Sequence, residues 1–122
     1  MAMTPIEIDE QSTYITLKPT YCRDDIVFRK KNGVVTVNFS NVLQNIPAGS
    51  MGTVVAVGGI PEGYRPNGLQ TITPGWLIGN AQVRFELYTD GHITGYNYGS
   101  AMSGNNMFLT NTISYVANDA TS

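Results

Sequence analysis

The chain has 122 residues, the length of one domain, and 42% of them are hydrophobic, which is too many for a disordered chain. Its net charge of -2, without a basic stripe, argues against nucleic acid as a partner. The single cysteine, Cys22, excludes an intrachain disulfide and every multi-cysteine zinc pattern. No apolar run is long enough for a membrane span, so membrane insertion is not expected.

Charged residues make up only 13% of the chain, about half of the share usual in soluble domains. A monomer normally covers its surface with charged side chains. The shortage therefore predicts that copies of the chain cover part of one another.

Residues 1–11 lack the basic region and apolar core of a signal peptide. The repeated methionine in Met1-Ala2-Met3 suggests a linker or a remnant of expression, with the natural protein continuing upstream. We expect one folded domain over residues 12–118 and a frayed polar tail over residues 119–122.

Thirteen glycines and six prolines, and the lack of a 3.6-residue periodicity, favour strands over helices. The first hairpin is predicted over residues 26–39, with Asn32-Gly33 as a two-residue type I′ turn. This register pairs Lys31 with Val34. It places on the core face Ile26, Phe28, Val35, Val37 and Phe39.

A second hairpin is predicted over residues 83–98, with Asp90-Gly91 as its two-residue turn. This register pairs Thr89 with His92. It places on one face Val83, Phe85, Leu87, Tyr96 and Tyr98, with His92 near the tip. The opposite face is mixed, a composition that suits an interface or a saccharide groove, and carries Arg84, Glu86, Tyr88, Ile93 and Asn97.

Further strands are predicted over residues 12–17, 52–57 and 107–116. The apolar run in residues 53–57 indicates a strand covered on both faces. Residues 45–51 and 58–73 are expected to be loops. The number and spacing of the strands predict an all-β fold, an antiparallel β-sandwich or jelly roll.

The loop sequence Ile60-Pro61-Glu62-Gly63-Tyr64-Arg65-Pro66 resembles the "LPxGYRP" signature of phage and prophage tail proteins. The turn Thr89-Asp90-Gly91 resembles their "TDG" turn, and the ending Ile113-Ser114-Tyr115 resembles their closing strand. The resemblance covers the chain from about Thr13 to Val116. In size and layout the chain is similar to the head domains of receptor-binding proteins from siphophages of lactic acid bacteria.

This resemblance implies a homotrimeric jelly-roll head at the phage tail tip or baseplate, joined to an upstream tail protein. The head would be part of the virion after assembly in the host cytoplasm. Its implied partner is a host cell-wall saccharide, which it would bind without catalysis and without a cofactor. A purely structural tail or baseplate part with the same fold is the alternative.

The residue types of the loop also suggest a structural role. Pro61 and Pro66 fix the backbone at its two ends, and Gly63 permits a sharp bend. Tyr64 combines a ring that can be buried with a hydroxyl donor, and Arg65 offers five donors to neighbouring carbonyls. We therefore expect these side chains to lock the loop.

Saccharides bind to aromatic platforms flanked by planar polar groups, and the chain offers such groups near its second hairpin. Trp76 lies between a Pro-Gly pair and a strand-like segment, where it would stack on a sugar or fill the core or an interface. The remaining candidates are Arg84, Asp90, His92 and Tyr96. A structural role for His92 and packing for Tyr96 are the alternatives.

No catalytic or metal-binding motif surrounds the single histidine or the single cysteine. A glycosidase would need a pair of carboxylates, and those available are Asp24, Asp25, Glu62, Glu86 and Asp90. Asp24 and Asp25 fit a solvated loop, and Asp90 fits a turn. We therefore expect no enzyme, and a polysaccharide-degrading tail enzyme is the weakest of the three alternatives.

Overall fold

The computed structural model describes residues 12–73, 81–104 and 107–118. In this part of the chain all regular structure is β, and no helix is long and apolar enough to cross a membrane. The strands are β1 (Thr13–Leu17), β2 (Ile26–Lys31), β3 (Val34–Leu43), β4 (Gly49–Val55), β5 (Gln70–Ile72), β6 (Val83–Leu87), β7 (Ile93–Asn97) and β8 (Met107–Val116).

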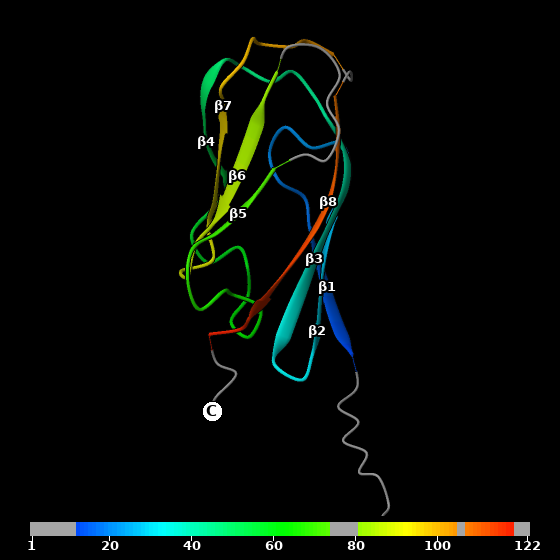
Figure 1. The fold of residues 1–122 in the computed structure, drawn as a ribbon, viewed down its shortest axis with the longest axis vertical. Helices are drawn as coiled ribbons and strands as arrows, with labels where there is room; N and C mark the ends of the chain where they lie inside the picture. Colours follow the sequence, from blue (N-terminus) through cyan, green and yellow to red (C-terminus); the bar gives the residue numbers. More distant parts are fainter. Residues whose placement is uncertain (1–11, 74–80, 105–106, 119–122) are drawn as a thin grey trace, which may run out of the picture.

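The strands form two four-stranded antiparallel sheets that lie face to face (Figure 1). The first sheet has the order β1-β2-β3-β8, a meander extended by the last strand. The second has the order β4-β7-β6-β5, in which β5, β6 and β7 follow one another and β4 lies beside β7, as in a Greek key. The expected antiparallel β-sandwich is confirmed.

The predicted first hairpin is also confirmed. Lys31 pairs with Val34 and Phe28 pairs with Val37, as the two-residue turn requires. Asn32 and Gly33 have φ angles of 55° and 79°, the left-handed values of a type I′ turn. The five predicted core residues of this hairpin are all fully buried.

The core lies between the inner faces of the two sheets. Phe39 of β3 stacks on Phe85 of β6 with ring centroids 5.4 Å apart, which joins the centres of the sheets. Burial of each large apolar side chain stabilises the fold by about 1.5–3 kcal/mol. The largest fully buried side chains are Phe28, Phe39, Phe85, Ile26, Leu43, Ile46, Ile60, Ile72, Leu87 and Ile93.

The predicted register of the second hairpin is wrong by one residue. Leu87 pairs with Ile93, and Tyr88 bonds with His92 through the backbone, so the loop holds Thr89, Asp90 and Gly91. Only Gly91 of this loop has a positive φ, 89°. A three-residue loop with glycine in the last position gives a bulge in place of a type I′ turn, and this shifts every partner on β7.

The shift reverses the two faces of β7. Tyr96 and Tyr98 point away from the core and are 41% and 55% exposed, whereas Ile93 and Asn97 are buried. Gly95 faces inward opposite Phe85, and the Sδ of Met51 and the ring of Phe85 leave little room for a side chain, each lying 3.2 Å from where a Cβ would stand. The aromatic residues therefore lie on the outer face.

Two further expectations differ from the structure. The strand predicted over residues 52–57 begins earlier and ends at Val55, because the chain turns where the Gly59 amide donates to the Ala56 carbonyl. Val57 is 68% exposed, so the apolar run is not covered on both faces. The short strand β5 lies inside the segment expected to be a loop.

Candidate functional site

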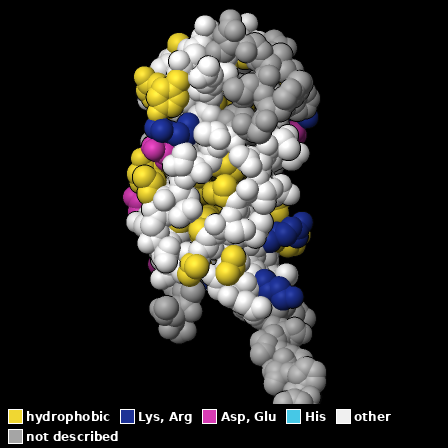
Figure 2. Space-filling model, in the orientation of Figure 1, with side chains coloured by type: hydrophobic (Ala, Val, Ile, Leu, Met, Phe, Trp, Pro, Cys, Tyr) yellow, Lys and Arg dark blue, Asp and Glu magenta, His cyan; other side chains and the backbone are white. Residues whose placement is uncertain are grey.

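The outer face of the second sheet gathers most of the aromatic and charged side chains of the second hairpin. Strands β6 and β7 are the two central strands of this sheet, and every second side chain on them points outward. We call this face, extended to the residues that flank the two strands and to the hairpin tip, the β6–β7 strip; it consists of Arg84, Glu86, Tyr88, Asp90, His92, Thr94, Tyr96 and Tyr98. Figure 2 shows hydrophobic, basic and acidic side chains together along this side of the molecule.

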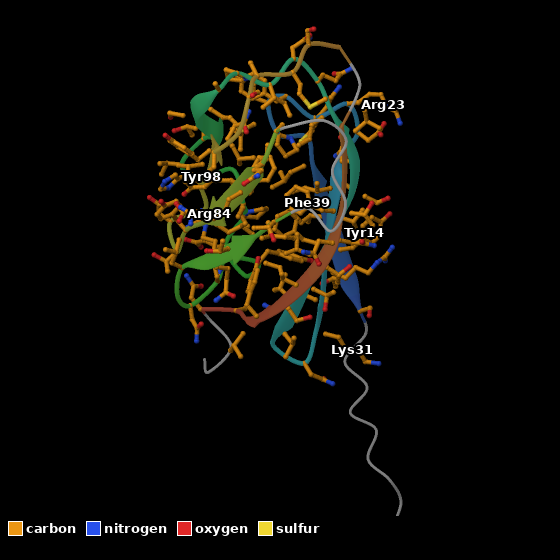
Figure 3. The ribbon with its side chains drawn as sticks, turned by 45° about the horizontal axis from the view of Figure 1, so that its top comes forward. Tyr14, Arg23, Lys31, Phe39, Arg84 and Tyr98 are labelled. Atoms are coloured by element: carbon orange, nitrogen blue, oxygen red, sulfur yellow. The ribbon has the colours of Figure 1, made fainter. Side chains whose placement is uncertain are left out.

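One end of the strip is aromatic and cationic. The rings of Tyr96 and Tyr98 lie 4.5 Å apart and are tilted by 46°. The guanidinium of Arg84 lies 4.9 Å from the centre of the Tyr98 ring, and Figure 3 shows the two side chains next to each other. This cation–π contact orients both groups at the surface.

The middle of the strip is an ion pair. Arg84 Nη2 lies 3.5 Å from Glu86 Oε2, and the Tyr88 hydroxyl donates to Glu86 Oε1 at 3.1 Å. Arg84 Nε is buried and has no hydrogen-bond partner among the described residues. Guanidinium and carboxylate groups of this kind bind the hydroxyl groups of a ligand in pairs.

The other end of the strip lies at the hairpin tip. Tyr88 and His92 stack with ring centroids 4.0 Å apart and nearly parallel planes. Asp90 bonds through Oδ1 to His92 Nδ1 and accepts from the His92 backbone amide at 3.1 Å. These bonds, the side-chain bond first, hold the pKa of Asp90 below its ordinary value.

The structure therefore brings four of the five saccharide candidates to one face: Arg84, Asp90, His92 and Tyr96. Trp76 lies outside the described residues. His92 and Tyr96 reach this face only through the corrected register, which places them beside Tyr88 and Arg84.

Glu86 and Tyr88 were expected on the mixed face that suits a saccharide groove, but they and Tyr98 were not among the five saccharide candidates. The signal for Glu86 and Tyr88 is the alternation along β6 and the residue that follows it, which places both on the same face as Arg84. The amide of Asn97, in contrast, takes no part in the outer face. It is 1% exposed and bonds the backbone of Pro47, Gln82, Gly99 and Ser100.

The Ile60–Pro66 loop is tied to the second hairpin. Arg65 Nε donates to the Ile60 carbonyl at 2.7 Å, and the Ile60 amide donates to the Gly91 carbonyl at 2.9 Å. Tyr64 donates to Thr13 Oγ1 at 2.7 Å, and its own carbonyl accepts from the Tyr115 hydroxyl. The two sequence elements that resemble tail proteins are thus in direct contact.

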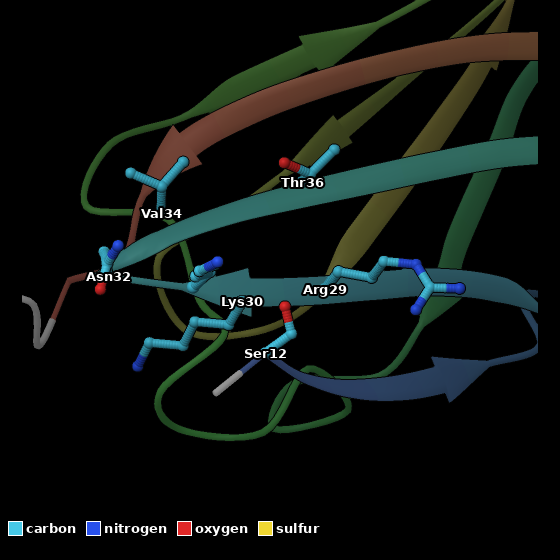
Figure 4. A pocket seen from close by; sticks show the side chains of 7 residues that line it. Ser12, Arg29, Lys30, Asn32, Val34 and Thr36 are labelled. Carbon is cyan, nitrogen blue, oxygen red and sulfur yellow. The ribbon is translucent and has the colours of Figure 1, made fainter. Parts of the chain in front are cut away.

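A separate hollow of about 510 Å³ lies on the first sheet, at the end of the β2–β3 hairpin (Figure 4). No saccharide candidate lines it. Its character is basic, because its lining consists of Ser12, Arg29, Lys30, Lys31, Asn32, Val34 and Thr36.

Among the described residues, no group of three or more histidine, cysteine, aspartate or glutamate side chains is arranged to hold a metal ion. No protein-family model matches the chain, and no curated protein matches it. A function for the chain is therefore inferred from the geometry of the β6–β7 strip.

Proposed function

We propose that the chain is a host-adhesion module of a phage or prophage tail that binds a cell-surface saccharide through the β6–β7 strip without catalysis. The observation that carries this proposal is the combination of two exposed rings, Tyr96 and Tyr98, with the neighbouring Arg84–Glu86 pair. The rings offer apolar faces to the C–H side of a sugar, and the ion pair offers donors and acceptors to its hydroxyls.

The position of the strip favours binding. Its side chains stand on two central, hydrogen-bonded strands, and a rigid support reduces the entropy lost when a ligand binds. Contacts within the strip, such as Arg84 over Tyr98 and Tyr88 on His92, hold the groups in place before a ligand arrives.

The contacts of the two carboxylates in the strip support adhesion over hydrolysis. A glycosidase needs one carboxyl group that stays protonated to act as general acid. The bonds from His92 lower the pKa of Asp90, which favours the ionised form. Glu86 is engaged by Arg84 and by the Tyr88 hydroxyl.

The tail location is supported by the sequence resemblance. The contacts of Arg65 and Gly91 make the "GYRP" and "TDG" elements parts of one structural unit. Two motifs that contact each other in the fold make the resemblance to tail proteins more specific than two short motifs that occur independently. We therefore propose a place at the tail tip or baseplate, with an upstream tail protein as partner.

The test is binding of the labelled domain to candidate host cells before and after their wall polysaccharide is removed. We expect binding that the removal abolishes and that Tyr98→Ala weakens about tenfold, the loss that corresponds to about 1.4 kcal/mol. Tyr14→Ala is the matched control, because Tyr14 is 63% exposed and lies beside Arg29 on the opposite sheet.

Two results would replace the proposal by an alternative. A domain that neither labels host cells nor competes with phage adsorption is a structural tail part. Release of oligosaccharides by the purified domain identifies an enzyme.

A further inference from the structure

We infer that the β6–β7 strip binds an extended, uncharged segment of a polysaccharide chain that lies along the strands, and not a single terminal sugar. This inference rests on the proposed function and specifies its ligand. It is carried by the length of the strip, by the continuity of its contacts and by its charge.

The strip is long. His92 and Tyr98 lie at its two ends along β7, and the backbone bonds of Tyr88 with His92 and of Tyr98 with Gln82 continue the ladder to both of them. At the rise of an antiparallel strand this distance is about 20 Å. A single sugar ring covers only a fraction of that length, whereas several linked rings cover it all.

The strip is also continuous. Tyr96 contacts Tyr98, Tyr98 contacts Arg84, and Arg84 pairs with Glu86. The series continues from Glu86 to Tyr88 and from Tyr88 to His92. The contacts therefore run without a break from the Tyr96 and Tyr98 rings through the Arg84–Glu86 pair to the Tyr88–His92 stack, so rings lie at both ends of the strip and charged hydrogen-bonding groups lie between them.

The charge of the strip argues against an acidic polymer. Arg84 is its only permanent cation and lies 3.5 Å from Glu86. The second carboxylate, Asp90, is ionised at neutral pH as an ordinary aspartate is, and the bonds from His92 lower its pKa further. Without an excess of positive charge the strip gains nothing from a phosphate or uronate chain. The basic hollow with Arg29 and Lys31 lies on the other sheet.

The experiment measures the affinity of the full chain for a panel of oligosaccharides from one ring to six. The panel contains glucose, galactose, rhamnose and N-acetylhexosamine units and matched members that carry uronate or phosphate groups. We expect affinity to rise at least tenfold from one ring to the longest neutral members, with no gain from the acidic ones and little dependence on salt.

Variants at the two ends of the strip separate an extended site from a local one. Tyr98→Ala and Tyr88→Ala should each weaken binding of the longest neutral member about tenfold, while Tyr14→Ala leaves it unchanged. Tyr88→Phe keeps the stack on His92 and removes only the bond to Glu86, so a several-fold loss in this folded variant supports the same conclusion if Tyr88→Ala fails to fold.

Each contrary result has one meaning. Equal affinity for one ring and six, or an effect of only one end, overturns the extended site while saccharide binding stands. Preference for the acidic members overturns the claim that the ligand is uncharged and leaves the extended site standing. Absence of binding to any member of the panel, together with absence of binding to host cells, overturns the proposed function itself.

Discussion

Gly91 occupies the point where the hairpin tip meets the Ile60–Pro66 loop. Its φ is 89°, and a Cβ at this position would stand 2.7 Å from the Ile60 carbonyl oxygen and 2.8 Å from Arg65 Nε. Both the backbone conformation and the space therefore require glycine. This explains why a glycine stands at this point of the turn.

We expect Gly91→Ala to destabilise the fold by about 2 kcal/mol or more, because backbone strain and displacement of the Ile60 carbonyl add up. Gly58→Ala is the matched control, since Gly58 has a similar φ of 86° but nothing within 4 Å of its missing Cβ. It should cost only about 1 kcal/mol. Urea unfolding of both variants measures the difference, and equal losses would contradict the role of the close approach.

Cys22 is an internal probe of unfolding. It is 3% exposed, and burial raises the pKa of its thiol to about 12. The thiolate is the reactive form, so the native thiol should resist alkylation at pH 8. We expect labelling to proceed only as fast as the domain opens and to become rapid in denaturant. Rapid labelling under native conditions would show that the core around Cys22 opens locally.

The two hairpins show what turn residues in a sequence do and do not specify. Asn32-Gly33 tolerates a positive φ at both positions, and the type I′ turn forms as expected. Asp90-Gly91 has the same pattern, but only Gly91 adopts a positive φ and Thr89 joins the loop. The Asp90 side chain accepts a hydrogen bond from the His92 backbone amide. The predicted two-residue turn did not include this contact.

Asp90 also makes the hairpin tip sensitive to acid. Its pKa is lowered in the folded state, chiefly by the bond from the His92 side chain. A lowered pKa contributes stability that is complete above the ordinary carboxyl value and is lost as the pH falls through the folded value. We expect Asp90→Asn to lose less stability than the wild type between about pH 5 and pH 2. Urea unfolding across this range measures it, and parallel curves would exclude the contribution.

At the scale of the whole molecule, the all-β class and the first hairpin follow from the sequence because alternation and turn chemistry agree there. The sequence also predicts that Arg84, Glu86 and Tyr88 share one face, since they alternate with apolar residues along β6 and just beyond its end. The sequence does not predict the outward position of Tyr96. It depends on the three-residue loop formed by Thr89, Asp90 and Gly91, which shifts β7 by one residue, and the Asp90-Gly91 pattern predicts a two-residue turn instead.

The low charge of the chain has a structural counterpart. Neither β3 nor β8, the two ten-residue strands that pair along their whole length, contains a charged residue. Their outer face carries hydroxyl and amide groups that bond one another, as Thr36 does with Ser114 and Thr112 with Asn38. Two exposed valines, Val34 and Val116, face each other at the end of this ladder.

We expect copies of the chain to associate through this β3–β8 face. Uncharged side chains whose polar groups already bond one another lose little hydration free energy when an interface excludes water. The two valines at the end of the face add hydrophobic burial. Light scattering should give about three times the chain mass of 13.2 kDa at micromolar concentration. Thr112→Arg places a charge in the middle of the face and should lower the mass to that of one chain.

Thr53→Arg is the matched control, because Thr53 is an exposed threonine on β4 of the opposite sheet. It should leave the mass unchanged. If the wild type is a monomer, the face has another partner, and the upstream tail protein is then the one to test. If both variants dissociate the assembly, the contact lies elsewhere. Dissociation by Thr112→Arg alone, with saccharide binding by the separated chains intact, would assign assembly to the first sheet and adhesion to the second.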